Sequence, residues 1–367
     1  MVLMPTPAVA APTVSTAAVR TAPQFNSTVW AVAFRGDVVY AGGSFTTVRS
    51  GGRTYERRRL AAFDARTGAV LSWNPTANGT VRALVVTTAG RAAVYAAGDF
   101  DTIGGHRRDA VARIDAVTGR PAAFAHRVSG TAATLAAGHG RIYLGGAFSA
   151  VDGTARRNVA AFRHSTGALD RGFRPATDSR VRALAATRTR LYLGGDFHKV
   201  NGSRRGNLAA VFPSTGRLIG SFRPRAPHNV LDLAVSRTGL STGTAGPGGR
   251  AVGYGPSGKV RWTHLFDGDV HNVAVLGNTT YAGGHFDRAC RSTSTIAQLG
   301  CPAGYSPRIK LAALDGNGRL TGWNPRANGR VGVHALTADP AHRRVAAGGA
   351  FTAVGGADRQ RFALFRG

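Results

Sequence analysis

Six acidic and histidine side chains between residues 267 and 334 have the types needed for metal binding or acid–base chemistry. They are Asp267, Asp269, His271, His285, Asp287 and His334. None shows a ligand spacing such as H-x-x-x-H, and polar residues on a surface are often simply solvated. We therefore predict no metal site and no cofactor, and treat five of the six as candidates for ligand binding. These five are Asp267, Asp269, His271, His285 and His334.

Motifs of nucleophilic or nucleotide-dependent catalysis are missing from the sequence. There is no G-x-S-x-G elbow, no P-loop and no zinc-protease motif. Glu56 is the sole glutamate, so a carboxylate pair for glycoside hydrolysis would have to be two aspartates, such as Asp267 and Asp269. These absences favour a binding protein over an enzyme. The alternative is a hydrolase or lyase whose site lies on the part of the chain that carries the six side chains.

The formal charge of +29 comes almost entirely from arginine, because Lys199, Lys259 and Lys310 are the only lysines. Such a charge favours contact with polyanions, including nucleic acid and acidic cell-wall polymers. A GC-rich genome, whose codons favour arginine over lysine, would explain the composition equally well, since the arginines are scattered along the chain. No standard nucleic-acid-binding motif occurs, so nucleic acid is a less favoured partner.

One short motif recurs along the chain and supplies a framework for these side chains. It reads YAGGSF at residues 40–45 and returns as YAAGDF, YLGGAF, YLGGDF, YAGGHF and AAGGAF. The second glycine of each copy stands at position 43, 98, 146, 195, 284 or 349, and a degenerate copy at 239–246 fills the one double interval. Seven copies at a period of about 48 residues are typical of a repeat protein.

Each copy belongs to a unit with alternating apolar residues. A first strand is exemplified by VRALVV at 81–86, a second runs into the glycine pair as in RIYLGG at 141–146, and a third follows a polar loop as in LAAFD at 60–64. A turn then leads to a fourth strand marked by an aromatic residue. Period-two patterning without a helical stripe predicts four-stranded antiparallel sheets. Seven such sheets predict an all-β fold, a seven-bladed β-propeller.

The fourth-strand aromatic residues indicate how the ring would close. The chain ends after a third strand, at RFALFRG, whereas Phe25 precedes the first complete unit. We therefore predict that the N-terminal segment APQFN supplies the outer strand of the last blade and hides two free sheet edges. The propeller would then span residues 23–367, after a flexible segment at 11–22. The seven aromatic residues are Phe25, Trp73, Phe124, Phe173, Phe222, Trp262 and Trp323.

The recurring motif has a structural interpretation. Its glycines permit a sharp turn, or a close approach to a neighbouring sheet where a Cβ would clash. The phenylalanine that follows, Phe45 in the first copy, would fill the gap between sheets. Asp64, Asp115 and Asp315 precede turns and are interpreted as turn-capping residues.

One arginine recurs three positions before the third strand in six units. Six equivalent guanidinium groups would form a ring that could hold phosphates or carboxylates. A residue that nearly every unit keeps is more simply explained by a contact that every unit needs, such as a loop carbonyl, and we favour this interpretation. We also expect Asp99 and Asp196 to pair with these arginines. The six are Arg57, Arg108, Arg156, Arg205, Arg308 and Arg359.

The pattern Y-x-G-G-x-F-x-x-V-x-G, followed by arginine, LAAFD-x-x-TG and W-N-P, resembles the delta-60-type repeats of secreted actinobacterial β-propeller proteins. It is also similar to repeats in fungal cortical polarity-marker proteins. The resemblance covers residues 25–367 and implies the propeller architecture, but no common chemistry. The fifth unit departs from the pattern because it lacks the phenylalanine and the arginine.

Matching positions in the first strands hold the remaining candidates for ligand contact. Trp30, Arg82 and Arg182 occupy the place that His271 and His334 take in later units. All five could face the mouth of a central channel, because loops before first strands and after second strands meet on one face of a propeller. They could equally pack between neighbouring blades, and we favour that second interpretation.

The first residues and the two cysteines indicate an oxidising environment. MVLMPTPAVA resembles the end of a secretory signal with cleavage after Ala10, so we interpret residues 1–10 as its remnant and the protein as secreted. Cys290 and Cys301 lie in one insertion and would form a disulfide. No apolar run is long enough for a membrane helix. We expect a monomer that binds an anionic or polyhydroxylated extracellular partner, namely a cell-wall polymer, a polysaccharide or a surface protein.

Overall fold

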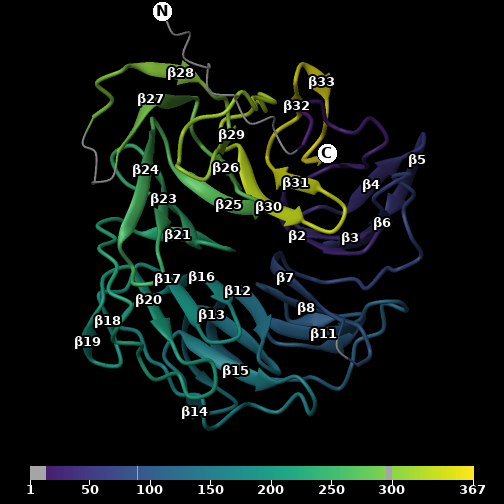
Figure 1. Ribbon diagram of the computed structural model, residues 1–367. Helices are drawn as coiled ribbons and strands as arrows, with labels where there is room; N and C mark the ends of the chain where they lie inside the picture. The colour runs from purple at the N-terminus through teal and green to yellow at the C-terminus, as the bar shows by residue number, and fades with distance from the viewer. Residues whose placement is uncertain (1–13, 89, 295–299) are drawn as a thin grey trace, which may run out of the picture.

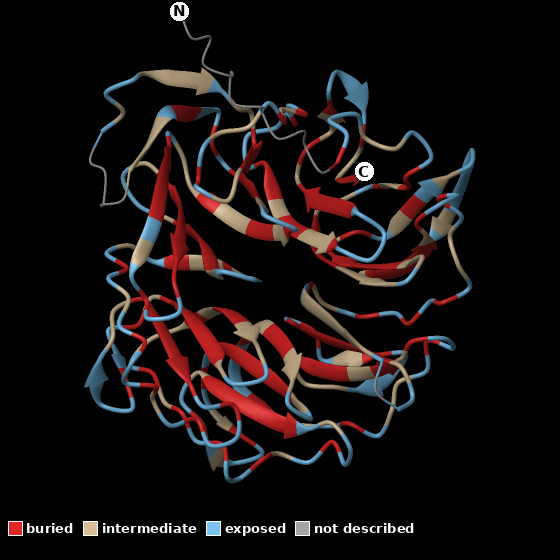
Figure 2. Ribbon diagram, in the orientation of Figure 1, coloured by how far each residue is buried: buried red, intermediate tan, exposed pale blue. Residues whose placement is uncertain are grey.

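The computed structural model describes residues 14–88, 90–294 and 300–367. Within these ranges the regular secondary structure consists of β-strands. Figure 1 shows the strands gathered into small sheets around a common centre, and Figure 2 shows that the buried residues are concentrated in these strands. No helix in these ranges is long and apolar enough to cross a bilayer.

Seven sheets in the described ranges contain the same antiparallel arrangement, in which a second strand lies between a first and a third. The first strands are β2 (Val29–Arg35), β7 (Val81–Thr87), β12 (Val128–Gly138), β16 (Val181–Ala186), β21 (Val230–Ser236), β25 (Val270–Leu276) and β30 (Val333–Asp339). The second strands are β3 (Val38–Gly43), β8 (Ala93–Gly98), β13 (Arg141–Val151), β17 (Leu191–Gly195), β22 (Gly239–Thr244), β26 (Thr279–Gly284) and β31 (Arg344–Gly349). The third strands are β6 (Leu60–Asp64), β11 (Val111–Asp115), β15 (Val159–Arg163), β20 (Leu208–Val211), β23 (Arg250–Tyr254), β29 (Leu311–Leu314) and β34 (Phe362–Arg366).

The fourth strand is shorter than the sequence predicts. Only the fifth sheet has a regular one among the described residues, β24 (Val260–Phe266). In five other sheets the fourth segment pairs with the third strand at a single bridge, as Val70 does with Phe63. Most of these segments soon reach a proline, Pro75 in the first unit, which has no N–H to donate and ends the pairing. The fifth unit has no proline there, so its fourth strand continues.

The glycine pairs lie where neighbouring backbones come close. A Cβ on Gly42 would lie 2.6 Å from Cγ1 of Val81, on the first strand of the next sheet, and a Cβ on Gly43 would lie 2.2 Å from the carbonyl oxygen of Thr28. The same relation joins the last sheet to the first, because a Cβ on Gly348 would lie 2.6 Å from Cγ1 of Val29. The predicted close approach between sheets is therefore confirmed.

Aromatic side chains fill the space between the sheets. The motif phenylalanines are buried, as predicted, and so are five tyrosines of the second strands that contact fourth-segment aromatic rings. Tyr40, for example, meets the Trp73 ring at 5.1 Å, and its hydroxyl donates to the Ala116 carbonyl of the next unit at 2.6 Å. The five pairs are Tyr40–Trp73, Tyr95–Phe124, Tyr143–Phe173, Tyr192–Phe222 and Tyr281–Trp323.

The N-terminal segment lies against the last sheet. The backbone N–H groups of Ser15 and Val19 donate to the carbonyls of Arg366 and Leu364 on β34, at 2.7 and 2.8 Å. Val14 is buried as well, so the described part of the segment expected to be flexible, residues 14–22, is in contact with the sheet. Around the centre, each first strand contacts the next one, and β30 contacts β2.

The predicted register of Phe25 is wrong. Phe25 is buried beside Phe362, with ring centroids 6.0 Å apart, but its strand β1 (Gln24–Phe25) pairs with β4 and not with β34. Its N–H donates to the Gln360 carbonyl as that of Ala77 donates to Arg58. Phe25 is therefore the counterpart of Ala77, and the residues that bond to the outer edge of β34 are Ser15 and Val19.

Hairpins follow the second strands in six of the units. In five of these units, neither hairpin strand belongs to the sheet of the preceding second strand. In the third unit, β14 (Thr154–Ala155) pairs with the end of the second strand β13 itself. In the sixth unit, the hairpin is extended and pairs with β24, so the fifth sheet becomes six-stranded. The hairpins are β4 (Thr47–Ser50) with β5 (Arg53–Glu56), β9 (Thr102–Ile103) with β10 (His106–Arg107), β18 (Lys199–Val200) with β19 (Ser203–Arg204), β27 (Arg288–Ser294) with β28 (Tyr305–Pro307), and β32 (Ala353–Val354) with β33 (Ala357–Asp358).

Candidate functional site

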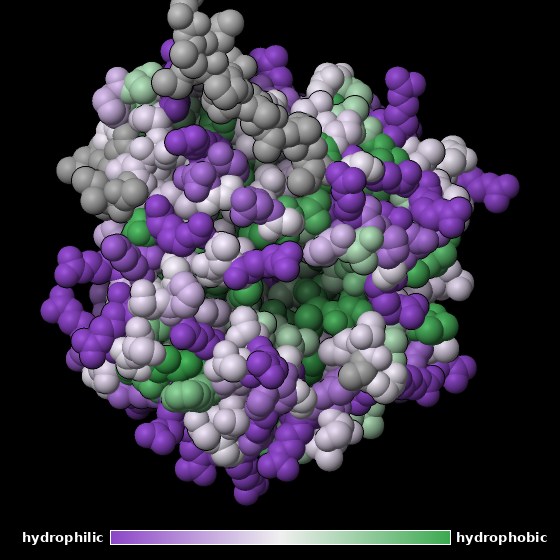
Figure 3. Space-filling model, in the orientation of Figure 1, coloured by the Kyte–Doolittle hydropathy of each residue, from purple (hydrophilic) through white to green (hydrophobic). Residues whose placement is uncertain are grey.

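The candidate site is a cavity of about 680 Å³ where the beginnings of several first strands meet. We name it the channel-mouth cavity. Six of the eight predicted ligand-binding residues line it, whereas Asp267 and His285 do not. The face of the molecule shown in Figure 3 is also hollowed near its centre, and the residues visible in that hollow are mainly hydrophobic. The ionisable and aromatic residues that line the channel-mouth cavity are Trp30, Arg82, Asp99, Arg180, Arg182, Asp232, Asp269, His271 and His334.

A row of aromatic rings from three sheets forms one side of the site. The Trp30 ring lies 4.2 Å from that of His334, and the His334 ring stacks on His271 at 5.3 Å. The His285 ring is parallel to the His271 ring, with centroids 6.5 Å apart. The guanidinium carbon of Arg82 lies 5.6 Å from the centroid of the Trp30 ring. Four of the five residues at matching positions, Trp30, Arg82, His271 and His334, are therefore neighbours in space. All five, including Arg182, line the cavity, so the favoured interpretation, that they only pack between blades, is wrong.

Burial keeps the two histidines of the cavity uncharged at neutral pH. Burial, together with the smaller effect of the nearby His271, lowers the pKa of His334 to about 4. The pKa of His271 is lowered for the same main reason. The Nδ1 of His271 lies 3.3 Å from the Val333 carbonyl, which can only accept, so Nδ1 carries the proton and Nε2 is the acceptor.

The arginines of the cavity are held by aspartates. The Nε and Nη2 of Arg82 contact the Asp99 carboxylate at 2.6 to 3.0 Å, and Arg182 and Arg180 contact Asp196 at 2.6 and 3.1 Å. Burial alone would raise the pKa of Asp196, but the hydrogen bonds and charges of the two arginines outweigh it and lower the pKa. These aspartates thus pair with arginines on a first strand or directly before it, and the expectation that they pair with the repeated arginines is wrong.

Asp232 is a residue of the site that the sequence reasoning missed. It stands on β21, and its Oδ2 accepts the N–H of Val273 on β25 at 2.9 Å. The residue as a whole is half-buried, and desolvation of its carboxyl group raises the pKa to about 7. A signal was available, because the matching position holds alanine in four other units, for example Ala83 and Ala183.

Asp269 and Asp267 have different roles although they alternate in sequence. Asp269 lines the channel-mouth cavity, and its Oδ1 lies 3.3 Å from the N–H of Gly246. Asp267 accepts the N–H groups of Asp287 and Arg288 at 2.9 Å and pairs with the Arg288 side chain. Asp267 therefore fixes the start of β27 and does not line the cavity. In the ranges that the structure describes, no three histidine, cysteine or acidic side chains are placed to hold a metal ion.

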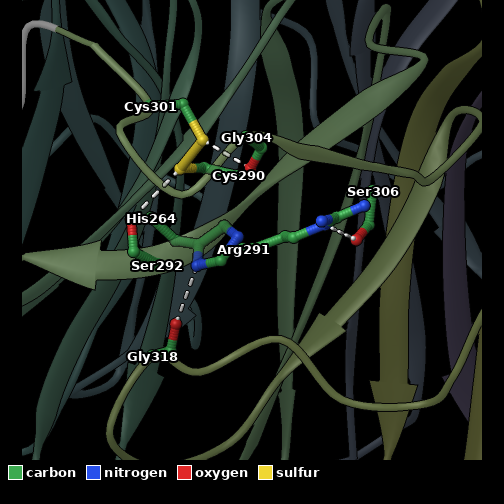
Figure 4. Close-up of a disulfide and its surroundings, with 8 residues drawn as sticks. All are labelled: His264, Cys290, Arg291, Ser292, Cys301, Gly304, Ser306 and Gly318. Carbon is green, nitrogen blue, oxygen red and sulfur yellow. Dashed lines mark hydrogen bonds between the residues drawn. A yellow bond between two sulfur atoms is a disulfide. The ribbon is translucent and has the colours of Figure 1, made fainter.

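The insertion of the sixth unit is joined by the predicted disulfide between Cys290 and Cys301. The bond ties β27 to the segment before β28, beside the fully buried His264 (Figure 4). The Nδ1 of His264 lies 3.0 Å from the Gly318 carbonyl, and burial lowers the pKa of this histidine to about 4. The disulfide thus fastens an added edge of the fifth sheet.

The repeated arginines have the structural role that we favoured. The Arg57 side chain donates two hydrogen bonds of 2.8 Å. One goes to the backbone carbonyl of the preceding residue, Glu56, and the other to the carbonyl of Leu71 in the fourth segment. Arg108 and Arg308 make the same two contacts in their own units. Asp64, Asp115 and Asp315 cap their turns through backbone N–H groups, as predicted.

Comparison with known proteins identifies the fold. No protein-family model and no curated protein matches the chain. Among solved structures, the WD40 β-propeller domain of Doa1 covers 95% of this chain and 95% of its own, with a TM-score of 0.59 at 12% identity. The computationally designed Ika8 protein covers 94% of this chain and 97% of its own, with a TM-score of 0.55 at 14% identity. Such low identity shows the fold alone, and the fold is that of a β-propeller.

Proposed function

We propose that this chain is a secreted β-propeller that binds a polyhydroxylated extracellular partner, such as a polysaccharide, at the channel-mouth cavity. We also propose seven blades and closure by the N-terminal segment. The seven similar sheets and the contact of β30 with β2 support the blade number. The bonds from Ser15 and Val19 to β34 support the closure.

The balance of charges in the channel-mouth cavity carries the proposal about the partner. Three arginines and three aspartates line it, and the two histidines are neutral at pH 7. Because the pKa of Asp232 is raised to about 7, its carboxyl group is only partly ionised at pH 7. A polyanion would therefore meet three guanidinium groups and a little less than three carboxylate charges, which gives little net attraction. Hydroxyl groups both donate and accept, so they match a surface on which the two kinds of group alternate. The cavity therefore favours a polyhydroxylated partner over an anionic one.

Export is a proposal that the disulfide supports. Disulfides persist in oxidising compartments and are rare in the cytosol of most organisms, and the Cys290–Cys301 bond is formed here. The resemblance of the repeats to those of secreted actinobacterial propellers agrees with this. Fractionation of cells into cytosol and medium, followed by mass spectrometry of the N-terminus, would test both export and cleavage after Ala10.

Binding can be tested by calorimetry with a panel of neutral and acidic oligosaccharides. We expect a neutral oligosaccharide to bind with an affinity that barely changes with salt, whereas affinity for a polyanion would fall steeply. Arg182→Gln and His334→Ala should each weaken binding about tenfold, the effect of losing one good hydrogen bond in a buried site. Lys259→Gln, on an exposed turn, is the control. Steep salt dependence, or equal losses in Lys259→Gln and Arg182→Gln, would contradict the proposal.

A second candidate function is a hydrolase or lyase with its site on blades five to seven. The observation that favours it is Asp232, a carboxyl group in a cavity whose pKa is raised to about 7, as a general acid requires. The assay is the appearance of new sugar ends from a glycan panel. Turnover that Asp232→Asn abolishes would support this candidate. Turnover unchanged by Asp232→Asn, Asp269→Asn and His271→Ala would eliminate the site.

A further inference from the structure

A second concave site, which we name the arginine groove, lies on the third unit beside the hairpin strand β14. Its volume is about 510 Å³. All of its charged lining residues are arginines, in contrast to the balanced charges of the channel-mouth cavity. The residues come from the loop after the second strand and from the segment that leads to the next first strand. The four arginines are Arg156, Arg157, Arg171 and Arg174.

Three of the four guanidinium groups are available to a ligand. Within the part of the chain that the structure describes, the exposed side chains of Arg157 and Arg171 make no hydrogen bond or ion pair. Arg174 donates from Nε to the Arg171 carbonyl at 2.7 Å, which orients the group and leaves its terminal nitrogens for another acceptor. Arg156 is buried, and it donates to the Ala155 carbonyl as its counterparts do in other units.

The carboxylates nearest in sequence are committed to other donors. Asp170 is buried and accepts from Arg141 at 2.7 Å and from the N–H of Gly172 at 3.0 Å. Asp152 contacts His126, and Asp178 accepts the backbone N–H groups of two residues on the neighbouring hairpin. None of these three lines the arginine groove. Positive charge in the groove is therefore not compensated from within, and the charges of Arg174 and Arg171 add to burial in lowering the pKa of Arg156.

The cluster is a departure from the repeat. In the fourth unit, Gly206 follows the repeated arginine where the third unit has Arg157, and Gly220 stands where it has Arg171. Arg223 is the counterpart of Arg174 and makes the same Nε bond, to the Gly220 carbonyl at 2.9 Å. The hydrogen bond that orients the guanidinium group is thus common to the third and fourth units. Of these two units, only the third has the additional arginines, Arg157 and Arg171.

We propose that the arginine groove binds the phosphate groups of an oligophosphate ligand through Arg157, Arg171 and Arg174. Guanidinium groups bind phosphate oxygens with paired, charge-assisted hydrogen bonds, and three around one concavity match a ligand with several negative charges. The volume lies in the range of small-molecule sites and exceeds the need of a single ion. The inference is independent of the ligand proposed for the channel-mouth cavity.

The test measures binding of tripolyphosphate by calorimetry to the full chain and to single exposed-arginine variants. We expect Arg157→Gln and Arg171→Gln each to weaken binding by about tenfold or more. Arg223→Gln, the matched control in the fourth unit, should change affinity less than about twofold. A glycerol phosphate oligomer with the same number of phosphates distinguishes the source: tighter binding of the oligomer indicates a polymer, and tighter binding of tripolyphosphate indicates a free phosphate compound.

Three outcomes would overturn the proposal. These are no binding of either probe, an equal loss in Arg223→Gln and Arg171→Gln, and unchanged affinity in the double variant Arg157→Gln/Arg171→Gln. The second would show general attraction to a basic surface, which salt removes for all polyanions alike. Neutral oligosaccharide binding by the same groove variants should stay unchanged, so failure here and failure of the channel-mouth proposal are separate results.

Discussion

Replacement of Asp232 by asparagine measures how much an ionisable carboxyl group in the channel-mouth cavity lowers the free energy of unfolding. Burial raises the pKa of Asp232 from 3.8 to about 7. The native and unfolded values thus differ by about three pH units, each worth about 1.4 kcal/mol. Between about pH 4 and about pH 7 the native state binds more protons than the unfolded state, so the free energy of unfolding falls as pH rises, by up to about 4 kcal/mol from this group.

Asparagine keeps an oxygen to accept the N–H of Val273 but cannot ionise. We therefore expect Asp232→Asn to be nearly neutral at about pH 4 and to stabilise the native state at about pH 8. The gain should be roughly 1–4 kcal/mol, since Asp232 is half-buried and lines the channel-mouth cavity, where contact with solvent would reduce the penalty on the ionised carboxyl group. The assay is urea denaturation of both proteins at a series of pH values, followed by tryptophan fluorescence.

Asp196→Asn is the control with the opposite sign. Arg182 and Arg180 lower the pKa of Asp196, so its ionised form stabilises the native state above the unfolded-state pKa, and this contribution is lost as pH falls through the native pKa. We expect Asp196→Asn to destabilise at neutral pH and to have a small effect in acid. The reasoning would be refuted if Asp232→Asn had the same effect at every pH, or destabilised the protein at about pH 8.

Two other predictions concern the framework. Gly283→Ala places a Cβ 2.6 Å from Cγ1 of Val333 and should lower the free energy of unfolding by about 1–3 kcal/mol. Gly322→Ala is the control, because the space around Gly322 is open and the substitution should have little effect. Chemical denaturation of both variants measures the difference. Replacement of Cys290 and Cys301 by serine opens a loop with a sequence separation of 11 and should lower the free energy of unfolding by roughly 2–3 kcal/mol. An unchanged denaturation midpoint would show that the disulfide does not constrain the unfolded chain.

The sequence predicts the sheets well because their requirements repeat. A glycine is needed wherever a Cβ would meet the next first strand, as at Gly42 against Val81, and this need recurs at six of the seven junctions; the second unit has Ala97 at the equivalent position. The register of the N-terminal segment was harder to predict, because aromatic type alone suggested that Phe25 matches Trp73. The backbone bonds show that Phe25 matches Ala77, so a residue type can mislead where the hydrogen-bond position is unknown.

The candidate site was predictable in position but not in its contacts. Trp30, His271 and His334 share one place in the repeat, and sheets arranged around a common centre bring equal places together. Asp267 was misplaced because an alternating pair of aspartates does not reveal which one caps a neighbouring strand. Asp232 was missed because its importance depends on burial between β21 and β25, which follows only from the packing of two sheets.

The bonds from Ser15 and Val19 to β34 have a consequence for synthesis of the protein. These residues leave the ribosome early, whereas their partners, Leu364 and Arg366, leave it more than three hundred positions later. The segment that holds Ser15 and Val19 is therefore synthesised long before its partners on β34, and the intervening sheets can form in the meantime. Contacts so distant in sequence are slow to form because of the entropy of closing the loop between them. Joining the last sheet to this segment is consequently expected to be a late step in biogenesis.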